Sequence, residues 1–228
     1  MSDPAPNADL LRSLGRLARG LSAIFWGLPI ALIVCAQTAK AEWFKSLGIL
    51  PPLAATSLLV YGLWQMGHFQ KQERVWRHAL DRAQFLSLVN VGLSPFLYWW
   101  NKIPANPFFF AVVMLLAGTS LLFLSQLNLV LQRLGAMLPD ETLRLETRQF
   151  TTLNRVLLLL TLLLIVIYVF LGRWPHPLPL WIASVLSLLD QAGLWCLIPL
   201  LLLPLAMTMA LIWKTKEVIL DSVFDAPR

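Results

Sequence analysis

The sequence predicts an all-α integral membrane protein, a polytopic helical bundle with six transmembrane helices and both termini in the cytoplasm. Three observations lead to this prediction. First, 58% of the 228 residues are hydrophobic and 13% are charged, whereas about a quarter of the residues of a soluble domain are charged. Second, the mean hydropathy is +0.69. Third, Lys and Arg alternate in abundance along the hydrophilic segments that separate the apolar ones.

The clearest transmembrane signal is the stretch between Arg155 and Arg173. Its 17 residues, VLLLLTLLLIVIYVFLG, carry no charge. At about 1.5 Å of rise per residue a helix of this length covers roughly 25 Å, and the flanking polar residues and snorkelling arginines supply the rest of a roughly 30 Å hydrocarbon layer. A soluble helix would carry a polar stripe. We therefore expect this segment to cross a membrane.

The other apolar segments divide the chain into further spans. The apolar run from Trp181 to Trp213 would be about 50 Å long as one helix, which exceeds a single crossing. We split it at Asp190, so that a short interfacial helix precedes the last span. Residues 1–20 form a cytoplasmic N-terminal segment and 214–228 a cytoplasmic tail. The six predicted spans are about 21–37, 47–66, 85–100, 108–131, 153–172 and 194–213.

Two amphipathic helices are predicted outside the bilayer. In the first, Arg12, Arg16 and Arg19 recur at spacings of four and three beside a leucine stripe, which is typical of a helix lying on a membrane surface. A signal peptide is the alternative here, because Ala39-Lys40-Ala41 follows a basic and an apolar region. The long basic region and the internal lysine favour an uncleaved span. The second helix precedes the third span and places one apolar face on Val75, Trp76, Ala79, Leu80 and Ala83.

The distribution of Lys and Arg predicts the orientation. The N-terminus, the second–third loop, the fourth–fifth loop counted through Arg155, and the C-terminus hold three, four, four and three Lys and Arg residues, and the remaining loops hold two, one and one. This is a positive-inside pattern with both ends cytoplasmic. The expected location is a bacterial cytoplasmic (inner) membrane, where the basic segments contact anionic headgroups of the inner leaflet. Because these residues flank apolar spans and are mixed with acids, we do not expect nucleic acid as a partner.

A short internal similarity accompanies this pattern. The segments DRAQFLSLVN (81–90) and ETRQFTTLNR (146–155) share an acid, a Gln-Phe pair and a following hydroxyl and Leu at an offset of 65 residues. Both lie where a cytoplasmic helix enters the predicted membrane. A true repeat implies three hairpins of about 65 residues. A chance match of this length is the alternative.

The sequence lacks the usual signatures of catalysis. The apolar interiors of the predicted spans hold no charged residue, although proton relays and ion sites need one there. The three histidines have no carboxylate or second histidine at metal spacing, so no metal is expected. No nucleophile elbow or phosphate-binding glycine loop occurs, so no catalytic residue or cofactor is predicted. Asp190 and Gln191, at the outer rim, fit either a helix N-cap or a site residue.

Polar side chains recur near the cytoplasmic ends of four predicted spans. At similar predicted depth they could line a cytoplasm-facing polar cleft that binds a small polar solute or a headgroup. The alternative is that they join helices by hydrogen bonds. The candidate residues are Gln65, His68, Asn90, Gln126, Asn128 and Asn154.

These observations favour a non-catalytic accessory, scaffold or assembly subunit of a membrane complex, which packs against a membrane-protein partner or forms a homo-oligomer. The alternative is a small-solute permease or channel that works as an oligomer, with proline-kinked spans and the polar cleft as its working parts. A lipid-modifying enzyme is a third hypothesis, but such a site generally needs a carboxylate, His or metal at the interface.

Overall fold

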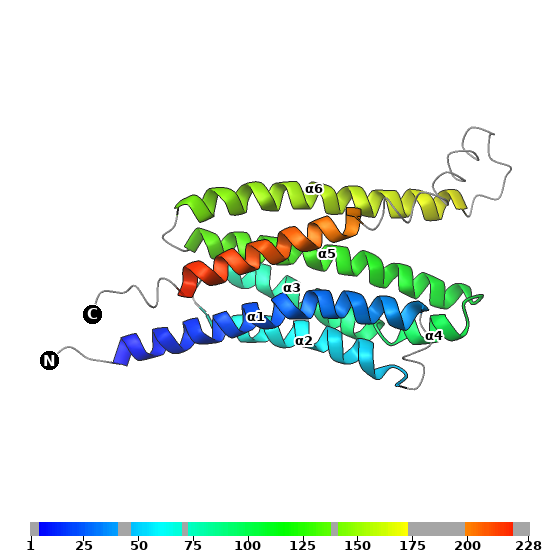
Figure 1. Ribbon diagram of the computed structural model, residues 1–228, viewed down its shortest axis with the longest axis horizontal. Helices are drawn as coiled ribbons and strands as arrows, with labels where there is room; N and C mark the ends of the chain where they lie inside the picture. Colours follow the sequence, from blue (N-terminus) through cyan, green and yellow to red (C-terminus); the bar gives the residue numbers. More distant parts are fainter. Residues whose placement is uncertain (1–4, 41–46, 70–72, 138–140, 173–198, 221–228) are drawn as a thin grey trace.

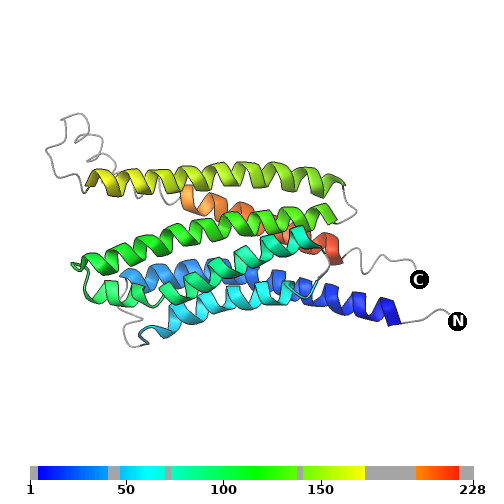
Figure 2. The ribbon, with the colours of Figure 1, turned by 180° about the vertical axis from the view of Figure 1, so that it is seen from behind.

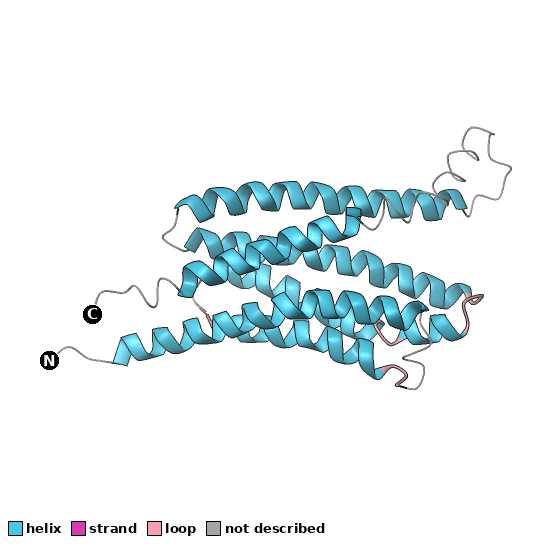
Figure 3. Cartoon of the chain, viewed as in Figure 1, coloured by secondary structure: helices cyan, strands magenta, loops and turns pink. Residues whose placement is uncertain are grey.

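The structure is a computed structural model that describes residues 5–40, 47–69, 73–137, 141–172 and 199–220 (Figure 1). These parts consist of helices and short turns without a strand (Figure 3). The labelled helices are α1 (Ala5–Lys40), α2 (Leu50–Met66), α3 (Arg74–Leu93), α4 (Phe96–Lys102), α5 (Pro107–Met137) and α6 (Glu141–Gly172). Residues 199–220 form a further helical segment.

The helices run along the long axis of the molecule in a bundle (Figure 1). Helices α2, α3, α5 and α6 contact one another in that order, and α1 packs along α2. Seen from the two opposite sides, α1 and the segment 199–220 lie over one face of this row (Figures 1 and 2). The all-helical prediction is therefore confirmed for the described part of the chain.

Three of the helices are long and apolar enough to cross a membrane. They are Arg12–Lys40 within α1, Pro107–Met137, which is α5, and Arg144–Ile167 within α6. They contain the predicted first, fourth and most of the fifth span. The predicted second span corresponds to α2, which has 17 residues, and the sixth lies partly outside the described residues. Three candidate spans are compatible with an integral membrane protein, and six crossings stay a prediction.

The N-terminal region differs from the prediction, because it does not form a separate surface helix. Helix α1 continues without interruption from Ala5 through Pro29 to Lys40. The leucine stripe of the helix expected to lie on a membrane surface instead packs inside the molecule, where Leu17 and Leu21 are fully buried. Burial of this stripe against the neighbouring helices stabilises one continuous helix across the predicted boundary.

The predicted third span at 85–100 does not correspond to one helix. Helix α3 ends at Leu93, a turn holds Ser94 and Pro95, and α4 begins at Phe96. Proline has no N–H to donate and its ring crowds the carbonyl four residues earlier, so the chain turns here. Because α3 begins at Arg74, the predicted loop helix and the first half of the predicted span are one helix.

The apolar face predicted for that loop helix packs into the core. Trp76, Ala79, Leu80 and Ala83 are all at most 5% exposed, whereas Val75 is 51% exposed. The four buried side chains belong to the same hydrophobic cluster as the buried leucines of α1 and α5. Four of the five predicted face residues therefore share the buried face of α3, and Val75 does not.

The described Lys and Arg residues gather at one end of the bundle. We call this the basic end; α1, α3 and α6 begin there, and α2, α5 and the segment 199–220 end there (Figure 1). The opposite end carries Lys40 and Lys102. The basic end carries Arg12, Arg16, Arg19, Arg74, Arg77, Arg82, Arg133, Arg144, Arg148, Lys214 and Lys216, and Arg155 lies nearer the middle of α6. There, Lys214 also forms an ion pair with Glu146, which links the segment 199–220 to α6.

Candidate functional site

Two of the six predicted cleft residues meet at a buried hydrogen-bonded cluster. The Thr208 hydroxyl accepts hydrogen bonds from Nδ2 of Asn128 at 3.0 Å and from Nδ2 of Asn154 at 2.9 Å. It also lies 2.7 Å from the carbonyl oxygen of Pro204, to which it donates. The three polar side chains are at most 2% exposed. They connect α5, α6 and the segment 199–220.

Helix α6 buries a polar stripe and exposes an apolar surface. Its buried side chains recur at spacings of four, three, four and three, as in a helix that packs along one seam. On the other faces large apolar side chains such as Leu163 and Phe170 are exposed. Small and hydroxyl-bearing residues at helix contacts with leucine outside are typical of helices packed in lipid. The buried stripe consists of Thr147, Thr151, Asn154, Leu158 and Thr161.

Asn90 lies apart from this cluster. Its side chain is 5% exposed, and its Oδ1 accepts a hydrogen bond from the Thr119 hydroxyl of α5 at 2.7 Å. Next to it, the Thr56 hydroxyl of α2 lies 3.3 Å from the Ser94 hydroxyl in the turn after α3. These contacts join α2, α3 and α5 in the middle of the bundle.

The remaining predicted cleft residues make local contacts. Gln65 donates from Nε2 to the Tyr61 hydroxyl at 2.9 Å, and Nδ1 of His68 lies 3.1 Å from the carbonyl oxygen of Trp64. Both bonds stay within the last turns of α2 and the residues after it. Gln126 has a buried Oε1 that makes no hydrogen bond among the described residues.

Taken together, the structure brings Asn128 and Asn154 into one cluster and places Asn90 in another. The contacts made by these three agree with the alternative in which polar side chains join helices. Asp190 and Gln191, predicted at the outer rim, lie outside the described residues.

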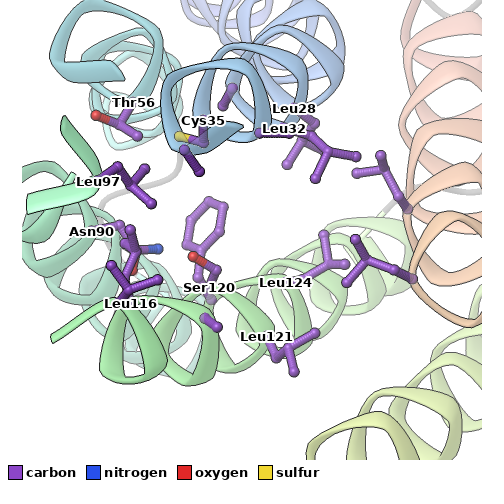
Figure 4. A pocket seen from close by; sticks show the side chains of 18 of the residues that line it. Leu28, Leu32, Cys35, Thr56, Asn90, Leu97, Leu116, Ser120, Leu121 and Leu124 are labelled. Carbon is purple, nitrogen blue, oxygen red and sulfur yellow. The ribbon is translucent and has the colours of Figure 1, made fainter. Parts of the chain in front are cut away.

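A cavity of about 330 Å³ lies elsewhere in the bundle, between α1, α2, α3, α4, α5 and the segment 199–220, and Ile165 of α6 also lines it (Figure 4). Its wall is mostly Leu, Ala and Val with two aromatic rings, Trp100 and Phe123. Asn90 is the one predicted cleft residue that lines it. The wall contains no Asp, Glu, His, Lys or Arg, so this cavity is suited to binding an apolar molecule rather than to acid–base chemistry.

Several residues at these contacts were not predicted from the sequence. In the sequence, Thr119 and Thr208 are hydroxyl-bearing residues within apolar segments, and nothing distinguishes them. In the structure, each forms a hydrogen bond with a predicted asparagine. Gly20 and Gly62 mark a close crossing of α1 and α2: a Cβ on Gly20 would lie 2.7 Å from the carbonyl oxygen of Gly62. Small residues let two helix backbones approach in this way.

No group of three or more His, Cys, Asp and Glu able to hold a metal ion occurs in the part of the chain that the structure describes. The thiol of Cys35 is free and faces the cavity (Figure 4). The side chains of the Asn128–Asn154–Thr208 cluster form hydrogen bonds between helices. The side chains of the cavity wall can surround a ligand.

Fold and site together define an all-helical protein with three helices able to cross a membrane and an apolar cavity between its helices. Comparison of the chain with protein-family models, with curated proteins and with solved structures finds no match.

Proposed function

We propose that the chain crosses a bacterial cytoplasmic membrane six times, with both termini in the cytoplasm, and acts as a non-catalytic accessory, scaffold or assembly subunit of a membrane complex. In this proposal the basic end faces the cytoplasm and contacts anionic headgroups of the inner leaflet. The partner is another membrane protein.

The six-span topology is supported by the arrangement of helices and charges. Successive passes run in alternating directions along the bundle (Figure 1). Helix α2 and residues 199–213 carry no charged residue, so both could lie in hydrocarbon beside the three longer helices. Of the 14 described Lys and Arg residues, Lys40 and Lys102 alone lie at the end opposite the basic end. That asymmetry is what the positive-inside rule requires of a single cytoplasmic face.

The observation that carries the non-catalytic role is the use of buried polar side chains for helix contacts. Asn128 and Asn154 both donate to Thr208, and Asn90 accepts from Thr119. In hydrocarbon a polar side chain is stabilised by such a partner on a neighbouring helix. Residues committed to these bonds fix the relative positions of the helices, which is the requirement for a rigid scaffold.

Helix α6 offers a surface for the partner. It lies at one edge of the bundle (Figures 1 and 2) and buries one stripe, while its other faces carry exposed leucines. Lipid tails are as apolar as these leucines, so the hydrophobic effect does not drive a partner helix onto them. Binding of a partner helix there depends on complementary shape and van der Waals packing. A protein whose outer helix keeps one fixed rotation, because Asn154 is tied to Thr208, can present such a shape.

Purification in mild detergent tests this proposal against the permease alternative. One foreign membrane protein that co-purifies in a constant ratio is the expected result. A homogeneous homo-oligomer that conducts a solute in liposomes would contradict the subunit role. The apolar wall of the cavity favours the first outcome, because a path for a polar solute needs more hydrogen-bonding groups.

A matched pair of variants sharpens this test. Leu163 on α6 and Leu115 on α5 are 54% and 56% exposed. We expect Leu163→Trp to reduce the recovered partner by about tenfold or more, as loss of a central contact of about 1.4 kcal/mol does. Leu115→Trp adds the same bulk outside the proposed surface and should leave recovery unchanged. Equal recovery with both variants would exclude α6 as the partner surface.

A further inference from the structure

We propose that the cavity is a binding site for an elongated apolar molecule that carries one hydrogen-bond-accepting oxygen, such as the carbonyl of a long-chain ketone. This site is separate from the proposed partner surface on α6. Its evidence is the shape of the cavity, the composition of its wall and the orientation of one buried amide.

The cavity is long and follows the helix axes. On α1 its wall extends from Leu28 to Ala39, and on α5 from Val113 to Leu124. The two end residues are eleven positions apart on each helix. At a rise of about 1.5 Å per residue, roughly 16 Å of each helix lines the cavity. A cavity of about 150 Å³ lined by apolar side chains stays dry and accepts a molecule of the size of benzene. This cavity is about twice as large and elongated, so it fits a chain.

The wall selects against ions and strongly polar solutes. Leu28, Leu32 and Leu124 contribute apolar surface on two sides (Figure 4). No side chain of the wall carries a permanent charge or a carboxylate group. Water gains too few hydrogen bonds along such a surface to remain ordered there. An apolar chain therefore fills this space better than water or a salt.

One buried side chain is directed into the cavity with unused hydrogen-bonding capacity. Asn90 is 5% exposed and uses its Oδ1 to accept from Thr119. Its amide nitrogen points into the cavity (Figure 4) and makes no hydrogen bond among the described residues. The side chain of Ser120 lies beside it on the wall. An amide N–H that faces an apolar space without an acceptor is costly, so a ligand oxygen placed here would be favoured over a plain hydrocarbon.

Photolabelling of the full-length protein in detergent micelles tests this inference. The probe is a long-chain methyl ketone with a diazirine on its chain, and the competitors are tridecan-2-one and tridecane. We expect saturable labelling at α1 residues 28–39 and α5 residues 113–124. Tridecan-2-one should compete at a concentration about three to ten times lower than tridecane does, as a single added hydrogen bond predicts.

Two pairs of variants separate binding from folding. Ala117 lines the cavity and Ala111 is exposed on the same helix, so Ala117→Phe should abolish labelling of the cavity wall and Ala111→Phe should not. Asn90→Leu should remove the preference for the ketone. Thr119→Val removes the Asn90–Thr119 bond without altering the wall, and it should retain that preference.

Unsaturable labelling, or labelling confined to outward-facing residues of α6, would overturn the inference. Labelling that persists unchanged in Ala117→Phe would do the same. If Asn90→Leu does not fold, the alanine pair and the comparison of the two competitors on the wild-type protein still decide the matter.

Discussion

Replacement of Thr208 by valine removes the hydroxyl group that joins three helices while nearly preserving the shape of the side chain. In the structure this hydroxyl accepts from Asn128 at 3.0 Å and from Asn154 at 2.9 Å. Two interhelical hydrogen bonds are therefore lost in the variant. We expect the free energy of unfolding to fall.

The size of this loss follows from the contacts that remain. Asn128 keeps its bond to the carbonyl oxygen of Leu124 at 2.8 Å, and Asn154 keeps its bond to that of Pro204 at 3.1 Å. Neither amide is left without an acceptor, so the desolvation penalty is small. Interhelical hydrogen bonds in membrane proteins average about 0.6 kcal/mol and reach about 1.7 kcal/mol. Two of them predict a loss of about 1–3 kcal/mol.

Unfolding in mixed micelles with increasing SDS, followed by tryptophan fluorescence, measures this free energy. Thr215→Val is the matched control, because Thr215 is also fully buried on the segment 199–220 and donates within its own helix, to Leu211 at 2.8 Å. The control should change the free energy of unfolding by less than about 0.5 kcal/mol. Equal losses for the two variants would refute the reasoning, because the interhelical bonds would then contribute nothing.

Four further substitutions test the helix contacts in the same titration. Gly62→Ala places a Cβ 2.6 Å from the Ile24 side chain and 3.0 Å from the Gly20 carbonyl and should cost about 1–3 kcal/mol. Gly15→Ala, which meets nothing within 4 Å, should be neutral or stabilising by up to about 1 kcal/mol; a similar loss for both would contradict a close crossing. Gln126→Leu removes a buried oxygen without a partner and should leave stability unchanged or raise it by about 1 kcal/mol, whereas Asn128→Leu should lower it by about 1–2 kcal/mol. Reversed signs for the last two would point to a solvated cleft at Gln126.

The features that the sequence predicts correctly are those carried by local periodicity. The stripe of Trp76, Ala79, Leu80 and Ala83 recurs at helical spacing, and it is buried. The uncharged run of α6 predicts a long apolar helix, which the structure contains. The buried threonines of α6 also recur at regular spacing, so their seam could have been found by the same method applied to hydroxyls instead of apolar residues.

Prediction and structure differ where a local pattern has two structural meanings. A basic helix with a leucine stripe fits a membrane surface, but it fits equally a helix that packs Leu17 and Leu21 against neighbouring helices. Pro95 is visible in the sequence, yet the apolar residues on both sides of it suggested one continuous span. In such cases the structure depends on what the apolar face packs against, and that packing partner is distant in the sequence.

The contacts between distant segments could not be predicted from one sequence. Thr208 is one of several hydroxyls in the C-terminal apolar run, and nothing local indicates that two asparagines donate to it. The pairing of Gly20 with Gly62 depends on how α1 and α2 cross. The cavity beside Asn90 arises from the packing of several helices, so its volume and its apolar wall are properties of the three-dimensional arrangement.

The most direct measurement of the proposed topology compares two reporter fusions in the intact chain. A reporter that is active in only one compartment is inserted between Asn101 and Asn106, at the end of the bundle opposite the basic end, and another copy at Asp140, in the connection between α5 and α6. The proposed six crossings place the first outside the cytoplasm and the second inside it. Activity of both reporters in the same compartment would contradict the account.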